Sequence, residues 1–448
     1  MGNSTVKVLA ALVGLAGAAL AADWPQFQGP DRSGVSPETG LLKSWPEGGP
    51  KVAWRIDDKL GRGFAGAVVQ GGKAYLLDND AGNDILRCID LASGRQEWTF
   101  KYPCEGKYKG NYNGSRNLPA VDDKNIYILS PYGEVRAISK EKHDEALWVV
   151  NLVEEYEMKD KGGERDIGNW GVCQSPVLYK DTVIVAPLTR KAGIVALDKA
   201  TGKEVWKSER LGQIAWTSPA ISTVEGVDQV VMLHTRDKPR LTGLDAATGK
   251  VLWQYSKWEC PNPIASHTDC GNGRFFITGG YAAGCAMVQV KKDGDKWTAE
   301  EVFQNKDLSA QACKPVFYKD HIYAASNSFP KAPQGVNETP EQKKQREVNN
   351  GLMCMDLKGQ VKWKTGGTNE EEIGSIIIAD GMIYNFLSEK GVLRLIVATP
   401  DEFKLLSEVR AVPKDMKAQN LWAPMALADG KLLIRYNRNM VCYDLKGE

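Results

Sequence analysis

The sequence has little that would support metal chemistry or cysteine redox chemistry. Only four histidines occur among 448 residues, at positions 143, 234, 267 and 321, and none has metal-ligand spacing to another. The nine cysteines include no CxxC motif and no adjacent pair, so zinc and thioredoxin-like sites are unsupported. Phosphate-binding loops, nucleophile elbows and dinucleotide-binding glycine motifs are also missing. We therefore name no catalytic residue and predict no metal site.

Charge of one sign and long apolar runs are equally scarce. There are 57 basic and 56 acidic residues and no long charged run, so the charge pattern of a nucleic-acid-binding protein is absent. The one long apolar stretch, residues 8–20, is shorter than the roughly 20 residues of a membrane span. Small residues follow it at 19–21, as in a secretory signal peptide. We expect residues 1–22 to be that signal, without a lipidation cysteine, and the mature protein to be exported to the periplasm or secreted.

A repeated segment accounts for most of what is present. Residues 194–206 recur almost unchanged at 241–253 and 87–98, and in degenerate form at 137–148 and 354–363. Each copy has a small residue, an apolar residue, Asp, a turn closed by Thr/Ser-Gly, a short strand and a Trp. Asp and Gly supply the turn, and the indole supplies a large surface for docking on the next repeat. The predicted docking residues are Trp54, Trp98, Trp148, Trp206, Trp253 and Trp363.

The repeat predicts an all-β fold, an eight-bladed β-propeller with four-stranded blades. A period of about 45–60 residues with several short strands is typical of propeller blades, and eight predicted hairpins start near residues 68, 120, 177, 220, 270, 316, 376 and 425. Residues 23–50 are expected to form an irregular wrap, and residues 51–448 a single propeller. The chain ends in a repeat without its last strand, which residues 51–55 supply. Closing the ring in this way removes free sheet edges.

The cysteines allow two interpretations. Cys88, Cys354 and Cys442 occupy the small-residue slot of the repeat, which favours buried, unreactive thiols. Cys260 and Cys270 could pair in an oxidising compartment, although sequence alone does not assign the pairing.

The longest predicted loops fall on one face of the propeller, at 101–115, 154–169, 257–266 and 328–350. Long loops on a rigid scaffold indicate the functional face. The residues expected at the channel mouth there are Arg116, Trp170, Trp216, His267, Asn327 and Trp422. They suit a small polar or aromatic ligand, or alternatively they plug the channel and pack the loops. Glu164, Asp166 and Asn169 could ligate calcium, or could simply be polar loop residues, the interpretation that we favour.

At residues 196–206 the repeat resembles the tryptophan-docking motif of the PQQ-like (pyrroloquinoline-quinone-like) β-propeller superfamily, and the resemblance extends over residues 24–448. The superfamily includes quinoprotein alcohol dehydrogenases and the propeller scaffold of outer-membrane protein assembly. The resemblance implies two functions. The first is a monomeric binding scaffold without catalysis or cofactor, whose long-loop face takes a protein, a peptide or a small polar ligand. The alternative is a PQQ- and Ca²⁺-dependent alcohol or sugar dehydrogenase. The chain cannot form the vicinal disulfide of those enzymes, so we expect the scaffold.

Overall fold

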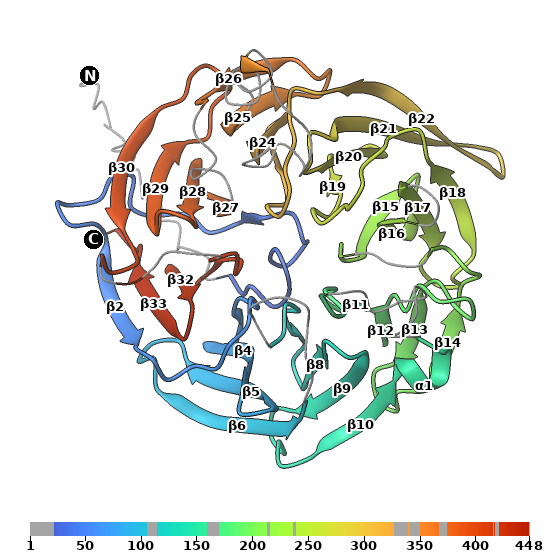
Figure 1. Cartoon of the computed structure of the whole chain (residues 1–448), viewed down its shortest axis with the longest axis horizontal. Coiled ribbons are helices and arrows are strands. Elements are labelled where there is room, and N and C mark those ends of the chain that lie inside the picture. Colours follow the sequence, from blue (N-terminus) through green and yellow to red (C-terminus); the bar gives the residue numbers. More distant parts are fainter. Residues whose placement is uncertain are drawn as a thin grey trace, which may run out of the picture.

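The fold is a ring of eight β-sheets around a central channel (Figure 1), as predicted. The computed structural model describes residues 22–104, 114–158, 170–212, 216–235, 239–326, 339–340, 350–366, 374–414, 416 and 421–447. Each sheet is a blade of four antiparallel strands, and blade 7 gains the short parallel strand β1 (Val35–Ser36). A short helix, α1 (Leu152–Tyr156), follows blade 2.

Within each blade the strands run from the channel to the rim. Blades 1 to 4 consist of β3 (Val68–Gln70), β4 (Lys73–Asp80), β5 (Asn83–Asp90), β6 (Gln96–Pro103); β7 (Ala120–Val121), β8 (Asn125–Leu129), β9 (Glu134–Ser139), β10 (Ala146–Asn151); β11 (Val177–Tyr179), β12 (Thr182–Val185), β13 (Val195–Asp198), β14 (Glu204–Lys207); and β15 (Ala220–Val224), β16 (Val227–Thr235), β17 (Pro239–Asp245), β18 (Val251–Tyr255). Blades 5 to 8 consist of β19 (Thr268–Asp269), β20 (Arg274–Gly279), β21 (Gly284–Asp293), β22 (Lys296–Asn305); β23 (Val316–Tyr318), β24 (His321–Ser326), β25 (Gly351–Asp356), β26 (Val361–Lys364); β27 (Gly374–Ala379), β28 (Met382–Leu387), β29 (Val392–Val397), β30 (Leu405–Arg410); and β31 (Ala426–Ala428), β32 (Lys431–Tyr436), β33 (Asn439–Asp444), β2 (Lys51–Ile56).

The repeat motif builds the turn between the third and fourth strands. In blade 3 the Asp198 carboxylate accepts the backbone N–H of Thr201 at 2.8 Å and its hydroxyl at 2.7 Å. Gly202 follows with a φ of +72°, a conformation that is open to glycine without strain. Blade 4 repeats this turn at Asp245 and Gly249. Three residues of the motif therefore fix the hairpin locally.

The tryptophans of the repeat occupy equivalent positions in six blades. Each one lies opposite the small residue of its own blade, in the pairs Cys442–Trp54, Cys88–Trp98, Ala137–Trp148, Ala196–Trp206, Gly243–Trp253 and Cys354–Trp363. The Trp206 indole packs on Gly249 of the next blade and donates to Ala246 O at 3.2 Å. Trp54 makes the corresponding bond to Leu91 O at 2.8 Å. Each of these indoles joins one blade to the next.

Blade 7 lacks a docking aromatic, because Ser407 lies opposite Leu395. The N-terminal segment fills this position. Leu42 N donates to Leu445 O at 2.8 Å, the carbonyl that corresponds to the acceptors of the other indoles. Trp45, which is 8% exposed, donates its backbone N–H to Ser407 Oγ at 2.9 Å.

The ring is closed by pairing an early strand with the last ones. Strand β2 runs antiparallel to β33, with Lys51 opposite Asp444 and Ile56 opposite Met440. It forms the outer strand of blade 8, as the split repeat predicts (Figure 1). A strand that would otherwise have an unpaired edge is covered, and blades 8 and 1 are joined through Trp54.

The segment before β2 crosses the base of the channel, where the first and second strands of the blades turn. Trp24, only 1% exposed, pairs with Val69 of blade 1. Arg32 donates to Pro176 O of blade 3 and, at 2.8 Å, to Pro219 O of blade 4. Strand β1 then pairs with β27 of blade 7. The segment connects the inner strands of blades that are far apart in sequence.

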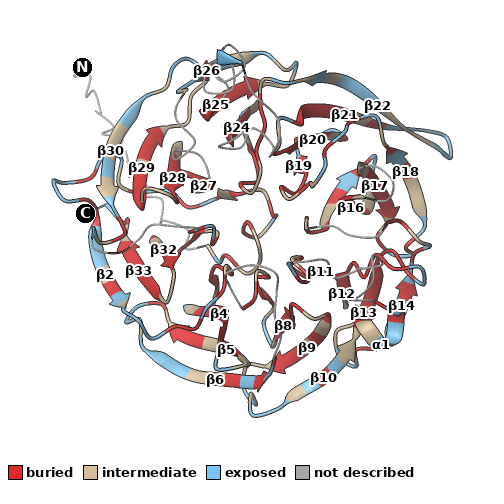
Figure 2. Cartoon of the chain, in the orientation of Figure 1, coloured by how far each residue is buried: buried red, intermediate tan, exposed pale blue. Residues whose placement is uncertain are grey.

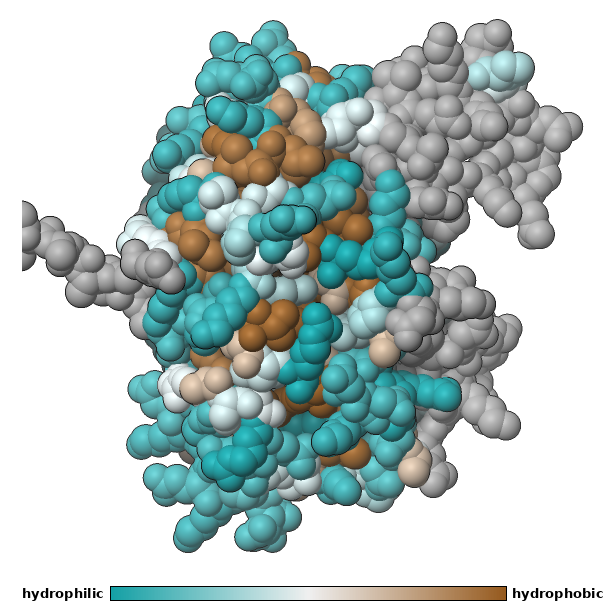
Figure 3. Space-filling view, turned by 90° about the vertical axis from the view of Figure 1, so that its left-hand side faces the viewer, coloured by the Kyte–Doolittle hydropathy of each residue, from teal (hydrophilic) through white to brown (hydrophobic). Residues whose placement is uncertain are grey.

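The outer strands at the rim are the most exposed, and the second and third strands of the blades are the most buried (Figure 2). On the side that carries β2 and β30, hydrophilic residues surround separate apolar patches (Figure 3); Val52 and Leu405 are 38% and 41% exposed. All nine cysteines are free thiols, so Cys260 and Cys270 are not paired. Within the described ranges, no helix is long and apolar enough to cross a membrane.

Candidate functional site

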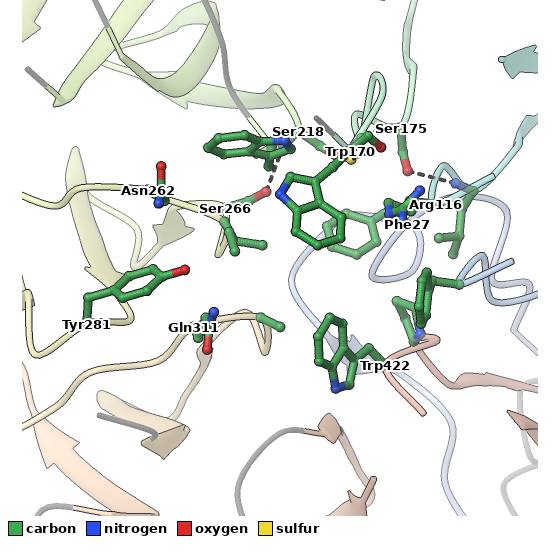
Figure 4. Close-up of a pocket in the computed structure, with 17 residues that line it drawn as sticks. Phe27, Arg116, Trp170, Ser175, Ser218, Asn262, Ser266, Tyr281, Gln311 and Trp422 are labelled. Carbon is green, nitrogen blue, oxygen red and sulfur yellow. Dashed lines mark hydrogen bonds between the residues drawn. The ribbon is translucent and has the colours of Figure 1, made fainter. Parts of the chain in front are cut away.

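A cavity of about 340 Å³ lies at the mouth of the channel, on the side of the inter-blade connections. Its walls come mainly from those connections, because residues that precede the inner strands of most blades converge there (Figure 4). The aromatic lining residues are Phe27, Phe64, Trp170, Trp216, Tyr281 and Trp422. Phe27 comes from the N-terminal segment that crosses the base of the channel. The volume is in the lower part of the range of small-molecule sites.

The structure brings together four of the six predicted channel-mouth residues. Arg116, Trp170, Trp216 and Trp422 all line this cavity. His267 does not line it: its neighbour Ser266 does, while His267 is 1% exposed and has its ring 5.8 Å from that of Phe275. The two residues lie just before β19, where the side chain of Ser266 faces the cavity and that of His267 packs beside Phe275. Asn327, like Glu164, Asp166 and Asn169, lies outside the described residues.

Arg116 is held by aromatic faces. Its guanidinium carbon lies 5.1 Å from the ring centroid of Phe64 and 5.7 Å from that of Trp170. Phe64 in turn stacks on Trp422, with centroids 5.6 Å apart and planes at 22°. Cation–π contacts of this kind orient a guanidinium. Arg116 therefore places a fixed positive charge on the wall of the cavity, between flat apolar surfaces.

Exposure separates the tryptophans of the cavity from those of the repeat. Trp170 and Trp422 are 45% and 40% exposed, whereas five of the docking tryptophans are 4–9% exposed. An indole that serves only to fill the interior would be covered, because burial of its surface is what stabilises the fold. The exposed faces of Trp170 and Trp422 are available to a ligand.

Other lining residues were not predicted. Phe64 and Gln311 come from inter-blade connections with no recognisable motif, and Tyr281 comes from the loop between β20 and β21. Ser175 and Ser218 also line the cavity, and each precedes the proline that opens an inner strand. This repeated Ser-Pro pair is the sequence feature from which the two serines could have been predicted to lie at the channel mouth. Phe27 carried no signal, because its place depends on the path of the whole N-terminal segment.

Buried basic groups lie beneath the cavity. Burial lowers the pKa of Arg32 to about 9 and that of Lys314 to about 8. Burial, with the positive charges of Lys314 and Arg32, lowers the pKa of His267 to about 3. Burial also raises the pKa of the cavity thiol Cys173 to about 11, against the opposing effect of Arg116. His267 is therefore neutral, and the thiol protonated, at pH 7.

The described residues of the cavity do not fit a metal ion. None of the described residues that line the cavity is an aspartate or glutamate, and Ca²⁺ takes mostly carboxylate and carbonyl oxygens. Elsewhere in the described ranges, no three His, Cys, Asp or Glu residues are grouped so as to hold a metal ion.

Comparison with known proteins places the chain in a family. Residues 132–399 match the family described as outer membrane protein assembly factor BamB. The chain belongs to this family. Its blades and docking tryptophans are those of a PQQ-like propeller, as the repeat indicated. No curated protein matches the sequence.

Solved structures with the same fold include two dehydrogenases and BamB. The quinohemoprotein alcohol dehydrogenase from Comamonas testosteroni is 13% identical, with a TM-score of 0.61 over 97% of this chain and 82% of that one. A europium-containing methanol dehydrogenase is 11% identical, with a TM-score of 0.63 over 92% and 89%. BamB from Moraxella catarrhalis is 13% identical, with a TM-score of 0.54 over 89% and 98%. At these identities the likeness concerns the fold alone.

Proposed function

We propose that this protein is an exported, non-catalytic binding protein that uses the cavity at the channel mouth to hold a small ligand. The ligand has a flat apolar body and an anionic group. The observation that carries the proposal is the convergence of Arg116 with the half-exposed Trp170 and Trp422 on one cavity of about 340 Å³. Export is supported by the apolar stretch at residues 8–20 and the small residues after it.

Each part of the cavity has a role in this proposal. The guanidinium of Arg116 pairs with a carboxylate through two parallel hydrogen bonds, and its aromatic neighbours keep it in place. The indole faces stack on the flat body of the ligand. A carboxylate on the wall would repel such a ligand, and none is found among the described lining residues.

The alternative is a quinone-dependent dehydrogenase, and the site fits it only in part. Aromatic faces and an arginine suit a planar carboxylated quinone such as PQQ, which would supply electron-transfer chemistry. The described donor set does not fit the calcium ion that the alternative requires. We therefore derive no catalytic step for this chain.

A binding experiment with matched variants tests the proposal. Naphthalene-2-carboxylate, followed by tryptophan fluorescence and calorimetry, should bind the parent protein more tightly than the neutral naphthalene-2-methanol. Arg116→Met should weaken carboxylate binding at least tenfold, about 1.4 kcal/mol. Trp170→Ala should also weaken binding, with little change in the melting temperature, because this indole is 45% exposed.

Arg136→Met is the matched control. Arg136 also lies over a ring, 4.0 Å from the centroid of Tyr102, but it is not part of the cavity. Binding that is equal for the acid and the alcohol, or lost equally in both arginine variants, would refute the proposal. A parallel titration with PQQ and Ca²⁺ plus an alcohol and a redox dye tests the alternative, since dye reduction would show an enzyme.

A further inference from the structure

Three serines on the cavity wall form a ladder of hydrogen bonds across successive blades. Leu118 N donates to Ser175 Oγ, Ser175 N to Ser218 Oγ and Ser218 N to Ser266 Oγ, each at 2.9 Å (Figure 4). The ladder runs from blade 2 to blade 5. Each serine lies two residues before the first residue of the inner strand of its blade. We call Ser175, Ser218 and Ser266 the serine ladder.

Every hydroxyl of the serine ladder has a hydrogen left to donate. A hydroxyl provides one donor and two acceptor positions. Each of the three serine hydroxyls accepts one backbone N–H. Within the described part of the chain, none of the three donates a hydrogen bond. Ser175, Ser218 and Ser266 are only 3%, 5% and 7% exposed, and all three line the cavity. Buried donors normally have acceptors, so a molecule in the cavity is the natural partner.

The remaining polar groups of the wall include further donors and one buried acceptor, Gln311 Oε1, which has no hydrogen-bond partner among the described residues. Arg116 can only donate. Trp216 Nε1 is buried and has no acceptor among the described residues. No lining residue in the described ranges is acidic. Arg116, Trp216 and the serine ladder are therefore complementary to oxygen acceptors, and Gln311 Oε1 is complementary to a donor.

We propose that the ligand is an aromatic compound with at least two acceptor groups, one paired with Arg116 and another accepting from the serine ladder. A single carboxylate accepts about four hydrogen bonds, and the two parallel bonds to the guanidinium take two of these positions. The three hydroxyls of the ladder and Trp216 Nε1 outnumber the two positions that remain, so these donors need a second group, such as another carboxylate or a ring carbonyl. This inference rests on the proposed function, and it narrows the ligand class from aromatic monoacids to aromatic compounds with oxygen at both ends.

Two probes that differ in one group test the inference. Naphthalene-2-carboxylate and naphthalene-2,6-dicarboxylate share their ring system, and calorimetry gives the ratio of their dissociation constants. In the parent protein the dicarboxylate should bind at least tenfold more tightly. Ser218→Ala should bring this ratio close to one, and Ser218→Thr, which keeps a hydroxyl, should restore it.

Ser375→Ala is the matched control. Ser375 Oγ also accepts an inter-blade N–H, from Met425 at 3.1 Å, and the residue is 5% exposed, but it does not line the cavity. Its replacement has the same kind of structural effect and should leave the ratio unchanged. If Ser218→Ala does not fold, Ser266→Ala serves in its place.

The outcomes separate this inference from the proposed function. Equal affinities of the two probes for the parent overturn the inference and leave the binding function standing. If the tenfold preference for the dicarboxylate persists in the serine-to-alanine variants, the preference arises from the general positive charge of the channel. This result also overturns the inference. The same follows if Ser375→Ala abolishes the preference. If neither probe binds, the proposed function fails and the inference with it.

Discussion

Buried basic side chains are the unusual residues of this channel. His267 is 1% exposed, and neither of its ring nitrogens has a hydrogen-bond partner among the described residues. His234 is equally buried, although its Nε2 lies 2.7 Å from Thr242 Oγ1. Burial lowers the pKa of both rings to about 3, from 6.5. Each ring is held neutral in the fold and becomes charged only when the chain unfolds.

This arrangement predicts a loss of stability in mild acid. Between pH 6.5 and pH 3 the unfolded chain binds a proton at each histidine and the folded chain does not. The free energy of unfolding therefore falls by about 1.4 kcal/mol per pH unit for each residue as the pH drops. His267→Leu should be more stable than the parent at pH 4, and its stability should depend less steeply on pH. Urea titrations from pH 4 to pH 7 measure both slopes, and parallel curves would contradict the prediction.

At the scale of the element, the hairpin turn of the repeat serves two purposes. Its glycine adopts a left-handed conformation, and the same glycine gives room to the indole of the preceding blade. At Gly249 both demands meet, because φ is +73° and a methyl group there would collide with the Trp206 ring. At Gly226 φ is also +73°, but nothing lies within 4 Å of the added carbon.

Alanine substitutions at Gly249 and Gly226 separate the effect of backbone strain from that of the contact with the indole. Both variants have the same backbone strain, about 1–2 kcal/mol for a left-handed residue. Gly249→Ala should lose a further 1–3 kcal/mol or so, the usual effect of overpacking, because the Trp206 indole has to move. Denaturant titrations of both proteins give the difference. Equal losses would mean that the indole does not depend on the glycine.

For the whole molecule, the N-terminal segment and β2 hold the ring together in different ways. Residues before β2 join inner strands through Arg32 and stand in for the docking aromatic that blade 7 lacks, through Leu42 and Trp45. Strand β2 completes blade 8 and covers the edge of β33. The first contribution stabilises a ring that is already closed, and the second closes it.

Two truncated proteins distinguish these contributions. A chain that starts at Lys51 keeps β2, and it should fold as a soluble monomer with a lower melting temperature. A chain that starts at Asp57 lacks β2 and leaves the edge of β33 unpaired, so it should aggregate. Size-exclusion chromatography and thermal melting compare the two. Equal solubility and equal melting temperatures would show that β2 does not close the ring.

Local pattern determined the architecture. The Asp-x-x-Thr-Gly turn and its tryptophan are contained within about a dozen residues, so the hairpins, the docking pairs and the number of blades followed from the sequence. The split repeat likewise predicted the pairing of β2 with β33, because a strand was missing at one end and present at the other. Arg116, Trp170, Trp216 and Trp422 were placed near one another by the same reasoning, since they end the connections that lead to the inner strands.

The tertiary structure decided what lies inside the channel. Phe27 and Arg32 reach the cavity and the layer below it because the N-terminal segment crosses the channel, and no local pattern encodes that path. Arg32 bonds to a carbonyl 187 residues away. Ser266 lies on the wall and His267 behind it, and a shift of one residue would exchange them. The serine ladder exists only because neighbouring blades set each hydroxyl beside an N–H of the previous blade. Contacts between residues so distant in sequence are fixed by closure of the ring, and the composition of the cavity follows from that closure.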